Sequence, residues 1–291
     1  AEALHEKKFA MVADKIYQQK DKVKLVLISG PSSSGKTTSS FRLALQMKVA
    51  GMNPVVLAMD NYFMNRDRTP RDENGNYNFE TIHALDLKQL NEDLIRLLKG
   101  EEVEIPRFDF ALGQRYYDGT KLKLNENDIF VMEGIHALNP LLTQGIPNDC
   151  KYKVYASALT SVSLDNNNFI STTDNRMIRR IVRDAATRGA TAQDTIKRWP
   201  SIREGEDRNI FPYQENADIM LNTSLLYELN ILKTYAEPLL REIAHSEAEY
   251  ADATRLLKLL SFFEGYRLEQ EREIPPTSVL REFIGNSSFN Y

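Results

Sequence analysis

Short apolar runs along the chain alternate with longer segments in which hydrophobic residues recur every three or four positions. Five of the apolar runs are rich in Val, Ile and Leu and have the length of strands buried on both faces. They cover residues 23–30, 53–60, 128–134, 151–158 and 217–224. Buried strands separated by helices predict an α/β fold, with a largely parallel sheet and helices on both of its faces.

The helical pattern is clearest in the segments between and after these runs. Residues 36–51 and 87–100 each end in a glycine, a common residue just past the last helical turn. Further helices are predicted at residues 3–19, 174–188, 192–198 and, over most of its length, 225–283. Residues 61–86 have the polar, turn-rich composition of an irregular segment. Alternating residues at 103–110 and 114–124 predict a β-hairpin that leaves the main sheet.

These elements predict one main domain with a small addition at each end of the chain. The boundaries are residues 1–22 for an N-terminal helix, 23–265 for the main domain and 266–291 for a C-terminal tail. Within the main domain, a helical lid is expected at about 173–200. The tail is expected to be peripheral and to pack through Leu280 and Phe283. The chain starts at Ala1 rather than Met, which suggests an excised or processed piece of a longer protein.

Composition narrows the classes of protein that this chain represents. It has 291 residues, of which 42% are hydrophobic and 27% charged, and its net charge is −4. The negative balance argues against a nucleic-acid-binding surface, and no apolar run approaches the ~18 residues that span a bilayer. The only cysteine, Cys150, excludes an intramolecular disulfide and fits a reducing, cytoplasmic environment. We therefore expect neither a nucleic acid nor a membrane as a partner.

The first strand runs into a glycine-rich loop with the Walker A spacing G-x-x-x-x-G-K-T, from Gly30 to Thr37. A strand precedes this loop and a helix follows it, as the motif requires. The glycines let backbone N–H groups approach phosphate oxygens, and the helix N-terminus adds partial positive charge. Lys36 would reach the β- and γ-phosphates, and the Thr37 hydroxyl would ligate Mg²⁺. The alternative is a serine-rich connecting loop with a surface lysine.

Two acids stand at the ends of predicted strands. Asp60 ends the second strand and Glu133 ends the third. Ligands of open α/β sheets lie beyond the carboxyl ends of the strands, so both acids should face the phosphate loop. One acid is needed to hold Mg²⁺, and a second is needed as a base if the phosphoryl acceptor is a hydroxyl. Taken singly, each acid is as readily a helix cap or a surface carboxylate.

A strongly basic helix is predicted after the fourth strand. Arg176, Arg180 and Arg183 follow one another at i, i+4 and i+7, so they should share one helical face. Arg179 lies at the margin of this face, and Arg188 follows near the end of the helix. So many arginines behind a phosphate loop suggest a lid that closes on the triphosphate and stabilises charge on the transferred group. The alternative is a solvated basic face, or ion pairs with acids of the same helix.

Several stretches of the chain, in this order, resemble the uridine kinase/phosphoribulokinase superfamily of P-loop kinases. They are SGPSSSGKTT, AMDNYF, NFETIHALDLKQLNEDL, IPRFDF, VMEGIHAL, DNRMIRRIVRDAATRG and ADIMLNTS, over roughly residues 24–224. The resemblance implies a three-layer α/β/α fold, the cofactors ATP and Mg²⁺, and often a homo-oligomer. The stretch RWPSIREGEDRNIFPYQENADIMLNTS resembles a bacterial nucleoside-kinase-like branch. In that branch a domain similar to the N-terminal region of threonyl-tRNA synthetase often precedes the kinase, which implies a missing N-terminal domain here.

The resemblance implies a role for individual positions of this sequence. The ATP-binding residues would be Gly30, Ser32, Ser33, Ser34, Gly35, Lys36, Thr37, Thr38, Arg180 and Arg188. The catalytic residues would be Asp60 as the base, Lys36 and Arg183. The acceptor would be bound by Asp60, Glu80, Phe108, Phe110 and Arg183. The Mg²⁺ site would comprise Thr37, Glu133 and Asp60.

The sequence departs from the family pattern mainly on the acceptor side. Gly113 stands where uridine kinases carry a histidine that helps to read the pyrimidine, and residues 80–82 are Glu-Thr-Ile instead of Asp-His-Pro. Ala190 replaces an arginine after the lid helix, and residues 159–171 are an insertion. The implied reaction transfers the γ-phosphoryl group of ATP to a hydroxyl of a uridine-like nucleoside or related sugar-containing small molecule. The alternative hypothesis is a regulatory module that binds or hydrolyses ATP without a small-molecule acceptor.

Overall fold

Five parallel strands form the central sheet, and they match the five predicted runs. The computed structural model describes residues 1–73, 75, 77–109 and 112–290. The strands are β1 (Leu25–Ser29), β2 (Asn53–Ala58), β7 (Asp128–Glu133), β8 (Lys151–Ser157) and β9 (Ile219–Asn222). Their spatial order is β2-β7-β1-β8-β9, and each neighbouring pair is parallel. The carboxyl ends of all five strands therefore lie at the same edge of the sheet.

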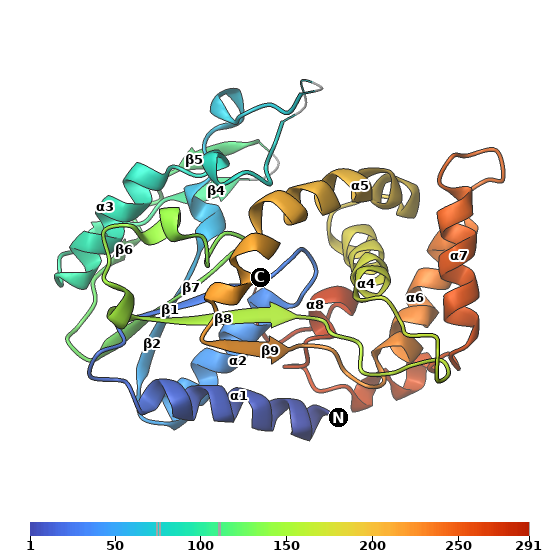
Figure 1. The fold of residues 1–291 in the computed structure, drawn as a ribbon, viewed down its shortest axis with the longest axis horizontal. Helices are drawn as coiled ribbons and strands as arrows, with labels where there is room; N and C mark the ends of the chain where they lie inside the picture. Colours follow the sequence, from blue (N-terminus) through green and yellow to red (C-terminus); the bar gives the residue numbers. More distant parts are fainter. Residues whose placement is uncertain (74, 76, 110–111, 291) are drawn as a thin grey trace.

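Helices cover both faces of this sheet and give the molecule three layers (Figure 1). Because successive side chains of a strand point to opposite faces, Val26 and Ile28 of β1 pack on one side, and Leu25 and Leu27 pack on the other. The first face is covered by α1 (Glu2–Tyr17) and α2 (Lys36–Val49). The second face is covered by α3 (Leu87–Leu98) and by the irregular segment before it. The predicted α/β/α architecture is confirmed.

The remaining helices gather beyond the carboxyl ends of β8 and β9 (Figure 1). They are α4 (Thr172–Thr187), α5 (Ala192–Asn209), α6 (Glu228–Arg241), α7 (Tyr250–Ser261) and α8 (Arg281–Ile284). Short 3-10 helices connect the elements: η1 (Met59–Tyr62), η2 (Arg66–Arg68), η3 (Ile82–Ala84), η4 (Pro140–Thr143), η5 (Asn148–Cys150), η6 (Phe211–Asn216) and η7 (Leu268–Glu273). The second lid helix, α5, continues well past residue 198, its predicted end. Among the described residues, no helix is both long and apolar enough to cross a membrane.

The C-terminal tail is not peripheral. Leu280 and Phe283 are buried, as expected, but they belong to the same hydrophobic cluster as α4, α5 and α6. Val279, Leu280 and Phe283 are each 0% exposed. The tail fills the space beside α4, so it is part of the core of this helical region rather than a surface extension.

The predicted hairpin is divided into two short antiparallel ladders. One pairs β3 (Val103–Glu104) with β6 (Lys121–Leu122), and the other pairs β4 (Arg107–Asp109) with β5 (Gln114–Tyr116). Pro106 lies at the break, where it has no N–H to donate to a ladder. The register shifts by two residues between Val103↔Leu122 and Arg107↔Tyr116. The two arms still run side by side, so the excursion is present with an interrupted ladder.

Candidate active site

The phosphate loop connects β1 to α2, and its backbone conformation and close packing require glycine at two positions. Ser33 and Gly35 have φ angles of 56° and 78°, in the left-handed region. A Cβ atom on Gly30 would lie 2.1 Å from the carbonyl oxygen of Ala156, and one on Gly35 would lie 2.8 Å from Cγ1 of Val279. No larger residue fits at either glycine without moving its neighbour. The loop is therefore fixed closely against β8 and the C-terminal segment.

The loop has polar groups that suit a phosphate ligand. The hydroxyl oxygens of Ser33 and Ser34 are buried and have no hydrogen-bond partner among the described residues. Buried polar groups without a partner are uncommon in folded proteins, and a bound ion or water is one explanation for them. Lys36 Nζ donates a hydrogen bond of 3.1 Å to the carbonyl oxygen of Pro31, so the ammonium lies over the loop. Burial lowers the pKa of Lys36. A ligand rich in negative charge would compensate that burial.

The two strand-end acids come together beside Lys36, as predicted. Glu133 is the last residue of β7, and Asp60 follows β2 in η1. In the sheet, Ala58 of β2 pairs with Glu133, which brings Asp60 to the same edge. Burial raises the pKa of Asp60, against the opposing charges of Lys36 and Arg188. Burial, and after it the charge of Asp60, raises the pKa of Glu133 to about 7.

The oxygen groups beside the loop are suited to Mg²⁺. Thr37 Oγ1 donates a hydrogen bond of 3.1 Å to Oε1 of Glu133. The described residues contain no group of three or more His, Cys, Asp and Glu that forms a complete metal cage. Mg²⁺ usually keeps several waters and is bound through one or two carboxylates together with substrate phosphates. Thr37, Glu133 and Asp60 therefore fit a nucleotide-bound Mg²⁺.

The arginines of α4 divide into two sets. On the lid side, Arg180 Nη1 donates to Ser32 Oγ at 2.5 Å, which joins α4 to the tip of the phosphate loop. Arg183, Arg180 and Arg188 also pair with Asp184, at 2.8, 3.1 and 3.6 Å. The alternative of ion pairs within the helix is therefore present, and the closure of a lid on the triphosphate stays a prediction. A single buried acid, Asp184, thus pairs with all three of these arginines.

The other set, Arg176 and Arg179, is buried and structural. Arg176 is 1% exposed, donates to the carbonyl oxygen of Ser32 at 2.9 Å and pairs with Glu206 of α5. Glu206 Oε1 in turn accepts a hydrogen bond of 3.0 Å from Ser32 N. Arg176 lies on the same side of α4 as Arg180, since both bond to Ser32, but its pairing with Glu206 buries it. Helical spacing predicts which residues neighbour each other, but not what a helix packs against.

Arg179 is likewise central rather than marginal. It is 0% exposed, and it donates to the carbonyl oxygens of Ser33 at 3.3 Å and Thr223 at 3.0 Å. Its ion-pair partner is Glu228 of α6, at 2.5 Å. Neither Glu206 nor Glu228 was predicted, since no motif surrounds them. A signal was available in α4 itself, because its four arginines are more than one face of a helix can present.

Glu80, a residue of the predicted acceptor site, lies near Arg180, Lys36 and Asp60. Burial raises the pKa of Glu80 to about 7, against the opposing charge of Arg180. Phe108 of β4 is half-buried and its ring centroid lies 5.7 Å from that of Phe63. The ring of Phe63 in turn meets Phe79 edge-on at 6.3 Å. These aromatic side chains lead from the hairpin to Glu80. Phe110, the other predicted aromatic, lies outside the described residues.

Gly113 has a structural reason to be glycine. Its φ angle is 67°, in the left-handed region. A Cβ atom there would lie 2.5 Å from Nε of Arg66. The backbone N–H of Arg66 also donates to the carbonyl oxygen of Gly113 at 2.8 Å. A histidine at this position would have to displace Arg66, so this part of the acceptor side is built differently from the family pattern.

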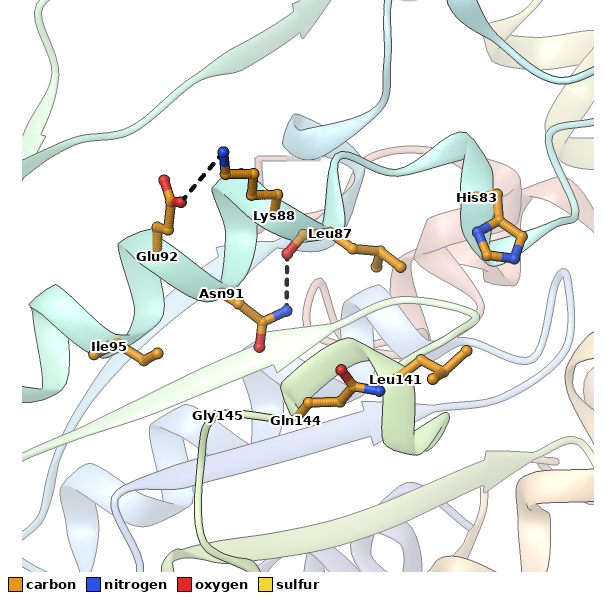
Figure 2. A pocket seen from close by; sticks show the side chains of 9 residues that line it. All are labelled: His83, Leu87, Lys88, Asn91, Glu92, Ile95, Leu141, Gln144 and Gly145. Carbon is orange, nitrogen blue, oxygen red and sulfur yellow. Dashed lines mark hydrogen bonds and ion pairs between the residues drawn. The ribbon is translucent and has the colours of Figure 1, made fainter.

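A groove of about 430 Å³ lies elsewhere, between α3 and the segment around η4 (Figure 2). Its lining residues are His83, Leu87, Lys88, Asn91, Glu92, Ile95, Leu141, Gln144 and Gly145. An exposed Lys88–Glu92 pair at 4.0 Å lies at its rim, and Asn91 Nδ2 donates to the carbonyl oxygen of Leu87 at 2.8 Å. No predicted site residue lines the groove, so it is separate from the phosphate loop and its acids.

Comparisons with known proteins agree with this arrangement. Residues 25–225, more than half of the chain, match the model of the Phosphoribulokinase / Uridine kinase family. A uridine kinase of Staphylococcus aureus (strain JH9) is 27% identical over 198 residues, which cover 68% of this chain and 86% of the relative.

Two solved structures are also similar in part. A possible uridine kinase from Bacillus stearothermophilus has 20% identity and a TM-score of 0.49, covering 74% of this chain and 98% of its own. A putative fructose transport system kinase from Silicibacter sp. TM1040 has 18% identity and a TM-score of 0.47, covering 73% and 98%. The family match rests on the stretch that contains the phosphate loop, both strand-end acids and the arginine helix. The chain therefore belongs to the phosphoribulokinase/uridine kinase family and is an ATP-dependent kinase.

Proposed function

We propose that this kinase transfers the γ-phosphoryl group of ATP to a hydroxyl of a nucleoside or a related sugar-containing small molecule. One observation carries the proposal: Asp60 and Glu133 lie at adjacent strand ends and interact electrostatically with each other and with Lys36. Two acids are what transfer to a hydroxyl requires, because one is needed at the metal and the other must receive a proton.

In this mechanism the backbone of the phosphate loop and Lys36 bind the β- and γ-phosphates of ATP. When bound, Mg²⁺ supplies positive charge at these phosphates, and Thr37 and Glu133 would hold it. Asp60 accepts the proton of the attacking hydroxyl. Burial raises the pKa of Asp60, which makes its carboxylate a stronger proton acceptor. Arg180 and Arg183 reach the transferred group when they leave Ser32 and Asp184.

Glu80 is proposed to hold hydroxyl groups of the acceptor. It interacts electrostatically with Asp60 and Lys36, so it faces the same space as the reacting groups. Phe108 and Phe110 are proposed to contact a flat ring of the acceptor, which favours a nucleoside. The uridine kinase among the curated relatives makes uridine the first acceptor to test.

The test is ATP consumption with a panel of pyrimidine nucleosides, purine nucleosides and simple sugars. Under the proposal, at least one member raises turnover far above hydrolysis without acceptor. With that acceptor, Asp60→Asn is expected to lower kcat by roughly 10²- to 10⁴-fold while ATP affinity is retained. Asp67→Asn, at an exposed position of η2, is the matched control. If no acceptor raises turnover, the alternative of a regulatory ATP-binding module replaces this proposal.

A further inference from the structure

The C-terminal segment reaches the donor site although it lies outside the region that matches the family, residues 25–225. Ile274, Val279, Leu280 and Phe283 anchor it in the hydrophobic cluster that also contains α4. Val279 lies against Gly35 of the phosphate loop. Figure 1 shows α8, near the end of the chain, lying close to α4. The segment is thus fixed in place next to the first turn of α2.

From this position a carboxylate binds the phosphate-loop helix directly. Glu282 Oε2 accepts hydrogen bonds from Thr38 N at 3.2 Å and from Thr38 Oγ1 at 2.7 Å. Thr38 is in the first turn of α2, where N–H groups have no partner within the helix. These N–H groups, with the helix dipole, are what a phosphate loop offers to its ligand. A side chain of the protein therefore uses part of the anion-binding capacity of the loop.

The charge of Glu282 also acts on the reacting groups. It is one of the carboxylates that interact with Lys36, together with Glu133 and Asp60. Ser33 and Ser34, by contrast, keep buried hydroxyl groups without partners among the described residues. The hydroxyl groups of Ser33 and Ser34 are thus available to a phosphate, whereas Thr38 is already bound by the carboxylate of Glu282. Two negative groups within a few ångströms of each other repel strongly when they are partly buried.

We propose that Glu282 is a residue of the donor site that competes with the phosphates of the nucleotide for the first turn of α2. Nucleotide binding then requires the carboxylate to leave Thr38, and the C-terminal segment sets the affinity of the kinase for its donor. The proposal concerns the ATP side only. It can fail or succeed whatever the acceptor is, so its outcome is distinguishable from that of the proposed function.

The test compares Glu282→Gln with the wild-type protein by calorimetric titration of ADP, ATP and adenosine. Glutamine keeps the size of the side chain but removes its charge. ADP and ATP are expected to bind about tenfold tighter to the variant, because the repulsion is gone. Adenosine, which has no phosphate, is expected to bind equally to both proteins. Glu273→Gln removes one charge from an exposed position of the same segment and should change each affinity less than twofold.

Weaker or unchanged binding of ADP and ATP to Glu282→Gln would overturn the proposal. An equal gain for adenosine would also overturn it, since the effect would then not involve phosphates. A measurement on the wild-type protein covers the case in which the variant does not fold. Hydrogen exchange at residues 281–290 should become faster when ADP is added, and slower or unchanged exchange there contradicts displacement of Glu282.

Discussion

The hydroxyl of Thr37 donates a hydrogen bond of 3.1 Å to Oε1 of Glu133, so the first turn of α2 and the end of β7 meet at one point. Thr37 is held there by the phosphate loop, and Glu133 by its strand pairing with Ile28 and Ala58. Both partners stand on regular elements rather than on free loops. This gives the proposed Mg²⁺ site a geometry that is fixed before any ligand arrives.

Glu133→Gln is expected to raise the Mg²⁺ concentration needed for half-maximal activity by roughly tenfold or more. The amide keeps the hydrogen bond from Thr37 but offers a weaker ligand to a hard cation. The measurement is a Mg²⁺ titration of activity at saturating ATP. Glu126→Gln is the matched control, because Glu126 is exposed and precedes β7 at the opposite end of that strand. An unchanged Mg²⁺ requirement in Glu133→Gln would remove Glu133 from the metal site.

Glu80→Gln is expected to stabilise the fold at pH 8 and to lose this effect near pH 4.5. Burial raises the pKa of Glu80 from 4.5 to about 7 in the folded protein. Below pH 4.5 the carboxyl group of Glu80 is protonated in both the folded and the unfolded protein, so it does not change the free energy of unfolding. Between pH 4.5 and 7 the carboxyl group of Glu80 loses its proton in the unfolded chain but keeps it in the folded protein, which favours unfolding. The loss of folding stability is complete above pH 7. A difference on the order of 1–3 kcal/mol at pH 8 is expected from urea unfolding.

The pH dependence is the decisive part of that experiment. The exposed Glu92, replaced by glutamine, provides the control for a general effect of removing one carboxylate. A stability gain that is equal at pH 5 and pH 8 would show that Glu80 is not held in an unfavourable ionised state.

Gly205→Ala is expected to raise KM for the acceptor severalfold and KM for ATP by a smaller factor. A methyl group at Gly205 would lie 2.5 Å from Cβ of Glu80, so Glu80 must shift. Steady-state kinetics with the acceptor identified in the panel separate the two constants. Gly265→Ala is the matched control, because its methyl group would meet only Thr234 Oγ1, at 3.8 Å. Equal changes in both KM values would indicate general damage to α5.

Glu228→Gln is expected to destabilise the protein by about 3–5 kcal/mol, because it leaves the buried charge of Arg179 without its partner. Arg179 and the carboxylate of Glu228 are 0% and 2% exposed. The exposed pair of Arg208 and Glu204 gives the contrast, and Glu204→Gln should cost no more than about 1 kcal/mol. Urea unfolding of both variants measures the difference. If both substitutions lower the free energy of unfolding by similar amounts, the buried pair of Arg179 and Glu228 does not stabilise the loop more than an exposed pair would.

The sequence predicts those parts of the site that depend on regular elements. Asp60 and Glu133 were placed correctly because strand endings are visible as the ends of apolar runs, and the strands of a parallel sheet end at one edge. The burial of Arg176 has no local signal, because it depends on Glu206, a residue of another helix. Glu282 had no signal, since it is distant in sequence from every motif and meets Thr38 only through the packing of the helical region. Contacts between remote segments are set by packing, which no local pattern reports.

Successive residues of α5 touch both halves of the site. Gly205 lies against Glu80 on the proposed acceptor side, and Glu206 bonds to Ser32 at the tip of the phosphate loop. A helix moves as a rigid body over such a short distance, so a shift caused at one contact is transmitted to the other. If binding of either substrate shifts α5, the affinities for donor and acceptor are linked, and each substrate changes the affinity for the other by the same factor. Two neighbouring residues of one helix thus give the kinase a direct route by which its two substrate sites can be coupled.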